Sequence, residues 1–197
     1  MRITALVGSR RKNGNTIIIV KNLLKTAEAS LPGAETEILY LGDYTIEACT
    51  GCEGCRTSWD CVIQDDYPAI VSSIDKADAL VLASPTYWYT VSSDMKRFID
   101  RSYSLIQYPV SRHEWISKYS GSGKVCVTVA VCEQHDESMM GSTLTLLNDF
   151  SRDLGIEVVA SIKALGHFEA GSVKGDSAVI DQAKQAGRKL AEKLGPV

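Results

Sequence analysis

The chain has 197 residues, of which 45% are hydrophobic and 23% charged, and its formal net charge is -3. This length can bury one substantial core, so we expect a single domain over residues 1–197. The composition excludes a disordered chain and a protein that coats nucleic acid. We find no secretion signal and no apolar segment long enough to cross a bilayer, so we expect a cytoplasmic protein without a membrane partner.

Apolar runs of strand length alternate with amphipathic stretches, which indicates a parallel sheet covered by helices. The runs are rich in β-branched and aliphatic residues, as in strands that are buried on both faces. The predicted strands are Arg2–Val7, Glu35–Leu41, Ala79–Ser84, Val125–Val131 and Ile156–Ile162. The sequence therefore predicts an α/β fold with a doubly wound sheet of five parallel strands, order 2-1-3-4-5, and helices on both faces.

Helical periodicity predicts a helix after each strand. The third begins near Ser92 and Ser93, either of which can cap the first amides, and it places Val91, Met95, Phe98 and Ile99 on one apolar face. The other four are Asn15–Ser30, Asp66–Ala77, Thr143–Leu154 and Ser177–Leu194. Two segments lack periodicity, Tyr108–Gly123 and Leu165–Gly175, and their length favours a functional or interfacial role over that of a simple connection.

A polar, glycine-containing loop joins the first strand to the first helix and reads Gly8-Ser9-Arg10-Arg11-Lys12-Asn13-Gly14-Asn15-Thr16. The free amides and dipole of a helix N-terminus favour an anion, and the hydroxyls of Ser9 and Thr16 can add hydrogen bonds. The spacing is neither that of a nucleotide P-loop nor that of the dinucleotide G-x-G-x-x-G turn. Spacing alone leaves two interpretations open, a phosphate site and an ordinary solvated turn.

The segment after the third strand is aromatic and reads Ser84-Pro85-Thr86-Tyr87-Trp88-Tyr89-Thr90. In the strand order 2-1-3-4-5, the loops after strands one and three meet where ligands bind doubly wound sheets. Aromatic rings there can flank a planar heterocycle. They can equally pack on their own helix or on a partner subunit.

These two loops, together with Met95-Lys96 and Phe98-Ile99-Asp100-Arg101, resemble the NADPH-dependent FMN reductase group of flavodoxin-like proteins. The resemblance implies a flavodoxin-like fold, the FMN phosphate on the first loop and the isoalloxazine ring along the second. A third contact segment would follow strand four, although here it lacks the glycines often found in the group. The implied FMN-binding residues are Ser9, Arg10, Arg11, Asn13, Asn15, Thr16, Pro85, Thr86, Tyr87, Trp88, Cys132, Glu133 and His135.

Four cysteines lie close together in the order Cys49-x2-Cys52-x2-Cys55-x5-Cys61. This spacing lets thiolates converge on a small inorganic cluster. It resembles the motif of iron-sulfur flavoproteins, a branch of the same group, whose four cysteines hold a [4Fe-4S] cluster near the flavin. Two alternatives stay open, cysteines without a cluster and a zinc site, whereas disulfides do not suit a reducing compartment.

No acid or base catalyst stands out, which is expected where FMN carries the chemistry. The resemblance implies an FMN-dependent oxidoreductase that moves electrons from NAD(P)H or a ferredoxin-like donor to a small-molecule or protein acceptor. The alternatives are a non-enzymatic electron carrier and a clusterless NAD(P)H:quinone or flavin reductase. The resemblance also implies a homodimer or homotetramer, and we expect no nucleic-acid partner.

Overall fold

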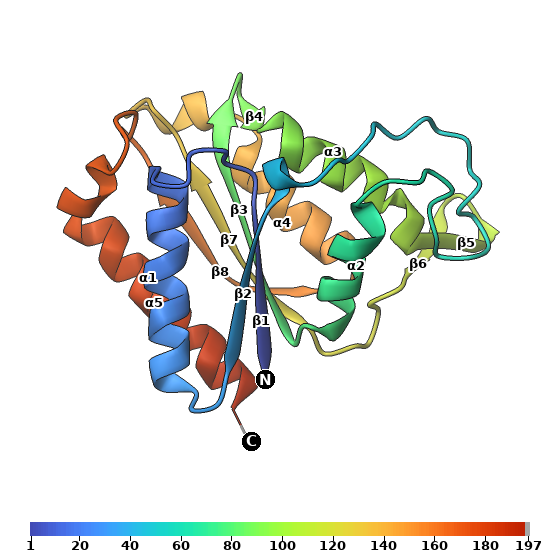
Figure 1. The fold of residues 1–197 in the computed structure, drawn as a ribbon, viewed down its shortest axis with the longest axis horizontal. Helices are drawn as coiled ribbons and strands as arrows, with labels where there is room; N and C mark the ends of the chain where they lie inside the picture. Colours follow the sequence, from blue (N-terminus) through green and yellow to red (C-terminus); the bar gives the residue numbers. More distant parts are fainter. Residues whose placement is uncertain (196–197) are drawn as a thin grey trace.

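A parallel sheet runs through the centre of the computed structural model, which describes residues 1–195 (Figure 1). Its strands lie in the order β2-β1-β3-β7-β8, which confirms the predicted doubly wound order. The inner strands are almost wholly buried, as their continuous apolar runs predicted. The bounds are β1 (Arg2–Val7), β2 (Glu35–Tyr40), β3 (Ala79–Tyr87), β7 (Val125–Val131) and β8 (Glu157–Ala164).

Helices cover both faces of this sheet and create two separate apolar cores (Figure 1). One face packs on α1 (Asn15–Ser30) and α5 (Ser177–Leu194), and the other on α2 (Tyr67–Lys76), α3 (Ser93–Arg101) and α4 (Thr143–Asp153). Short 3-10 turns complete the chain: η1 (Leu41–Asp43), η2 (Ser102–Leu105), η3 (Glu137–Met140) and η4 (Ser172–Gly175). Across residues 1–195, every helix is too short or too polar to span a membrane.

The third strand is longer than predicted. We expected it to end at Ser84, but β3 continues to Tyr87 because Thr86 and Tyr87 pair with the short antiparallel strand β4 (Thr90–Val91). Trp88 and Tyr89 make the tight turn with φ values of 48° and 64°, in the left-handed region. The expected aromatic loop is therefore a narrow β-hairpin that projects from the end of the sheet.

The segment Tyr108–Gly123, predicted as a loop, is largely structured. It contributes to a second, two-stranded sheet formed by β5 (Ile106–Ser111) and β6 (Glu114–Ser117). This hairpin lies beside the cysteine-containing segment 44–66 (Figure 1), to which the exposed Arg112–Glu53 ion pair joins it. Several of its apolar side chains are exposed, so no buried face marks these strands in the sequence.

Helices α1 and α5 approach each other backbone to backbone at Gly187. A Cβ atom at this position would lie 2.4 Å from the carbonyl oxygen of Leu23 and 3.0 Å from Cβ of Thr26. Real Cβ atoms do not come so close to a backbone oxygen, so any larger residue forces the two helices apart. Glycine at 187 thus sets the spacing of the helical layer that contains α1.

We expect Gly187→Ala to lower the free energy of unfolding by about 1–3 kcal/mol, as overpacking of a tight core contact does. Urea unfolding monitored by circular dichroism measures this loss. Gly175→Ala is the matched control, because a Cβ there meets no atom within 4 Å, and we expect little change. Equal stability of the two variants would contradict a tight α1–α5 contact.

Candidate functional site

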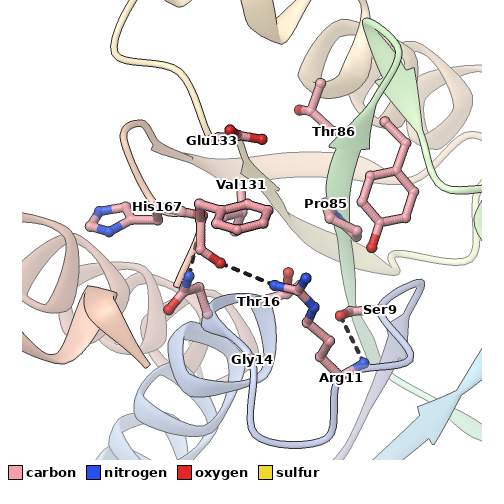
Figure 2. A pocket seen from close by; sticks show the side chains of 12 residues that line it. Ser9, Arg11, Gly14, Thr16, Pro85, Thr86, Val131, Glu133 and His167 are labelled. Atoms are coloured by element: carbon pink, nitrogen blue, oxygen red, sulfur yellow. Dashed lines mark hydrogen bonds between the residues drawn. The ribbon is translucent and has the colours of Figure 1, made fainter. Parts of the chain in front are cut away.

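A cavity of about 100 Å³ opens at the carboxyl ends of β1, β3 and β7 (Figure 2). This is the position at which doubly wound sheets bind ligands. Its walls come from the loop after β1, the end of β3, the end of β7 and the segment after β8. The lining residues are Ser9, Arg11, Gly14, Asn15, Thr16, Pro85, Thr86, Tyr87, Val131, Glu133, His167 and Phe168.

The first turn of α1 faces this cavity without a side-chain cap. Gly14 occupies the N-cap position, has no side chain to offer the helix amides, and is followed by no acidic residue in the first turn. The loop is itself ordered, because the amide of Gly14 donates to the carbonyl of Arg11 at 2.9 Å. Uncapped amides and the positive end of the helix dipole make this helix start an anion-binding element.

A buried hydroxyl fixes the start of the same loop. Ser92 Oγ donates to the carbonyl of Gly8 at 2.7 Å and accepts from the amide of Met95 at 3.3 Å, so Ser92 is the cap of α3 among the two serines predicted for it. The amide of Ser92 in turn donates to Ser84 Oγ at 3.0 Å. These buried hydrogen bonds therefore join the loop after β1 to the end of β3 and the start of α3.

The segment after β8 forms a wall of the cavity that the motifs did not reveal. Arg11 Nη1 donates to the carbonyl of Phe168 at 3.0 Å, and its guanidinium lies 5.3 Å from the centre of the Phe168 ring. His167 also lines the cavity (Figure 2), and its ring nitrogens lie 3.2 Å from Ser172 and Asp176. Only the unusual length of Leu165–Gly175 pointed to this segment in the sequence.

Asn15 holds this wall in place. Its amide nitrogen donates to the carbonyls of His167 and Glu169 at 3.2 and 2.9 Å. Its Oδ1 accepts from the amides of Gly171 and Val173 at 3.0 and 3.2 Å. The Asn15 side chain thus uses both its donors and its acceptor oxygen within the protein, so its role at the cavity is structural.

A wider cavity of about 590 Å³ adjoins the first one and shares Thr86, Tyr87 and Glu133 with it. This volume is in the range of small-molecule sites. The hydroxyl of Thr86 is buried and has no hydrogen-bond partner within residues 1–195, so it is available to a polar ligand atom. The lining residues are Thr86, Tyr87, Trp88, Tyr89, Cys132, Glu133, Gln134 and Met139.

Three residues implied by the resemblance lie outside both cavities. Arg10 turns away and pairs with Asp94 through Nε and Nη2 at 2.7 and 2.8 Å. Asn13 is exposed at the tip of the loop, and His135 packs against Gly166, where a Cβ atom would lie 2.2 Å from its ring. The other ten implied residues line one cavity or both.

The four cysteines lie on one segment between η1 and α2 and are free thiols. Cys55 is buried, which raises its pKa, and the nearby Cys61, Cys49 and Cys52 raise it further. A backbone hydrogen bond from Gly54 lowers the pKa of the exposed Cys52. Within residues 1–195 no three cysteine, histidine or acidic side chains converge as a preformed metal site. The thiols fit a [4Fe-4S] cluster in number and kind, and cluster binding requires the segment to draw them together.

Comparison with known sequences gives the same group of proteins. The chain matches the family model of the NADPH-dependent FMN reductases over residues 1–167. It is 35% identical over 127 residues to an iron-sulfur flavoprotein of Archaeoglobus fulgidus, a match that covers 63% of this chain and 57% of that protein. It is 28% identical to an iron-sulfur flavoprotein of Methanocaldococcus jannaschii over 98% of this chain and 96% of the other. Other matches span about half of the relative's length.

Solved structures confirm the flavodoxin-like fold. An FMN-dependent NADH-azoreductase from Bacillus anthracis, in complex with FMN, superposes with a TM-score of 0.71 at 13% identity over 97% of this chain and 100% of that one. An NAD(P)H:quinone oxidoreductase from Methanothermobacter marburgensis gives 0.73 at 17% identity, covering 96% and 98%. An archaeal flavodoxin gives 0.58 at 14% identity, covering 98% and 99%. At such identities the likeness is one of fold.

The Arg10–Asp94 pair predicts a pH dependence of stability. The hydrogen bond from Arg10 lowers the pKa of the buried Asp94 carboxyl. Its contribution to stability is therefore complete above the unfolded pKa of about 4 and is lost as the pH falls through the lower folded pKa. We expect Asp94→Asn to destabilise the protein at pH 7 and progressively less below pH about 4, as measured by urea unfolding.

The matched control for this measurement is Asp100→Asn on the same helix. Asp100 is exposed and, within residues 1–195, pairs with Lys96 alone, so we expect a small effect at every pH. If wild type and Asp94→Asn lost stability in parallel on acidification, the role assigned to the Asp94 carboxylate would be wrong.

Proposed function

The chain belongs to the NADPH-dependent FMN reductase family, and on that premise we propose that it is an FMN-dependent oxidoreductase of the iron-sulfur flavoprotein branch. The observation that carries the proposal is the uncapped start of α1, which faces a cavity continuous with a wider, aromatic-lined one. A phosphate and a planar ring need these two environments side by side.

In this proposal the first turn of α1 binds the FMN phosphate. The backbone amides and the hydroxyls of Ser9 and Thr16 donate to it, and both side chains are buried, which strengthens each bond. Arg11 adds a positive charge at the edge of the cavity and keeps the Phe168 wall beside it. These residues hold the phosphate and thereby orient the rest of the cofactor.

The wider cavity receives the isoalloxazine ring. Tyr87 and Trp88 would flank it, and the hydroxyl of Thr86, which has no hydrogen-bond partner within residues 1–195, would donate to or accept from a polar atom of the ring. When bound, FMN supplies hydride chemistry at N5 and one- or two-electron transfer. The protein then needs to position donor and acceptor, and we assign no acid or base role to Glu133 or His167, which line the cavities.

We propose NAD(P)H or a ferredoxin-like protein as the electron donor and a small molecule or protein as the acceptor. The cysteine segment would hold a [4Fe-4S] cluster through Cys49, Cys52, Cys55 and Cys61, as the names of the relatives suggest. The mouth of the site is rich in exposed aromatic groups, with Trp88 91% and Phe168 51% exposed. Such a surface supports a homodimer or homotetramer with the flavin near the subunit boundary.

Thr16→Val tests the phosphate site. Loss of one hydrogen bond to a charged group costs about 1.5–3 kcal/mol, so we expect FMN affinity to fall roughly tenfold to a hundredfold. Quenching of flavin fluorescence on titration with apoprotein measures it. Thr26→Val is the matched control on the same helix. In the described part of the chain the Thr26 hydroxyl bonds the carbonyl of Asn22 alone, so we expect this substitution to leave affinity unchanged. Equal affinity for both variants would contradict a phosphate at Thr16.

The anaerobic visible spectrum, with iron and sulfide analysis, tests the function as a whole. We expect flavin bands together with about four iron and four sulfide per chain, and bleaching of the flavin by NADH or NADPH. Flavin without iron after reconstitution would indicate the clusterless reductase. Reduction by ferredoxin but by neither nucleotide would indicate an electron carrier, and protein that cannot be loaded with flavin would refute the proposal.

A further inference from the structure

The segment Leu165–Gly175, here called the wall segment, closes one side of the smaller cavity and lies mostly beyond the region that matches the family model, which ends at residue 167. Its first residues are tied to the segment after β7. The amide of Gly166 donates to the carbonyl of Gln134 at 3.0 Å, and the amide of His167 donates to the carbonyl of Cys132 at 3.0 Å. The wall segment therefore begins at a fixed position beside both cavities.

A single side chain fixes the path of the rest of the wall segment. Asn15, in the first turn of α1, hydrogen-bonds two carbonyls and two amides of its backbone. The amides belong to Gly171 and Val173. Gly171 has a φ of 88°, in the left-handed region that favours glycine, and Val173 is fully buried. The wall segment is thus held by the same helical turn whose free amides face the cavity.

Phe168 brings the wall segment against the opposite side of the cavity. Arg11 extends from the loop after β1 toward the wall (Figure 2), where its Nη1 donates to the Phe168 carbonyl at 3.0 Å. Its guanidinium carbon lies 5.3 Å from the centre of the Phe168 ring. The space behind this contact is about 100 Å³, far below the range of cavities that hold a whole nucleotide. This end of the site therefore has room for a phosphate group but not for an adenosine beyond it.

The donors around this cavity suit a phosphate that ends a molecule. The first amides of α1, the hydroxyls of Ser9 and Thr16, and the Arg11 guanidinium approach it from different elements. A phosphomonoester offers three free oxygens and about −1.5 to −2 charges at pH 7. A phosphate within a diphosphate bridge has fewer free oxygens and less charge. The monoester therefore satisfies more of these donors and gains more from the helix dipole.

We propose that the wall segment sets the flavin specificity of the site: it admits a flavin whose phosphate is terminal and rejects a flavin dinucleotide. The inference deepens the proposed function and rests on a flavin that binds with its phosphate at the start of α1. A dinucleotide has to continue beyond its first phosphate, and the Arg11–Phe168 contact closes that exit. Phe168 is the specificity-determining residue, and Asn15 is the positioning residue that holds the wall segment in place.

The test measures the affinities of the full-length apoprotein for FMN, FAD and riboflavin by isothermal titration calorimetry. We expect wild type to prefer FMN over FAD by about tenfold to a hundredfold or more, because FAD loses hydrogen bonds to its charged phosphate. In Phe168→Ala and in Asn15→Ala we expect this preference to fall about tenfold. Riboflavin affinity stays at the wild-type value in both variants, because riboflavin has no phosphate to reach the wall segment.

Two matched controls separate this role from general effects on stability. Asn22→Ala removes an asparagine of the same helix whose amide, in the described part of the chain, donates to the carbonyl of Ile18 alone. Trp115→Ala removes an aromatic ring of β6 that is 47% exposed, close to the 51% of Phe168, and lines neither cavity. We expect both controls to keep the wild-type affinities for all three flavins.

Equal affinity of wild type for FMN and FAD would overturn the proposal, and so would an unchanged preference in Phe168→Ala. An Asn15→Ala variant that weakens all three flavins by the same factor would show a merely structural role and refute the positioning role. If Asn15→Ala does not fold, Phe168→Ala decides, because it changes a half-exposed ring and keeps the Asn15 hydrogen bonds. Wild type that binds no flavin at all would instead overturn the proposed function, and this inference with it.

Discussion

The site depends on one close polar contact between the loop after β1 and the start of α3. A Cβ atom at Gly8 would lie 2.6 Å from Ser92 Oγ and 2.9 Å from Cβ of Met95, so no other residue fits there without displacing α3. The Ser92 hydroxyl satisfies the carbonyl of Gly8 and the first turn of α3 at once. Because these hydrogen bonds are buried, the loop between β1 and α1 has one stable conformation. In that conformation the first amides of α1 point into the cavity.

Helix α3 connects the two regions to which we assign cofactors. It is capped by Ser92 at the cavity and ends at Arg101 on the cysteine-containing segment. At about 1.5 Å per residue, its nine residues span roughly 13 Å. Its inner face, with Met95 and Phe98, is fully buried in one of the two cores, so the helix is held along its length. A rigid element of this kind fixes the separation between the cavity and the cysteine-containing segment.

Local sequence patterns predicted the helices and strands that are well buried. They failed where strand pairing depends on contacts between distant residues or where the strands are exposed. The inner strands and α1 and α5 were correct because continuous apolar runs and one-sided stripes are direct consequences of packing on a sheet. The β5–β6 hairpin was missed because Val110 and Trp115 are 80% and 47% exposed. The end of β3 was misplaced because β4, which extends it, has only two residues.

By itself, the sequence determined the family, the order of the sheet and the two loops that meet at its carboxyl edge, because glycine, capping residues and apolar runs act over a few neighbouring positions. Only the tertiary structure decided which side chains share the site. In the folded chain Arg11 contacts Phe168 and Asn15 hydrogen-bonds the loop after β8. Arg10 points away from the cavity and pairs with Asp94. Such contacts join residues far apart in the chain, and they exist only once packing of the helices on the sheet has set the distances between them.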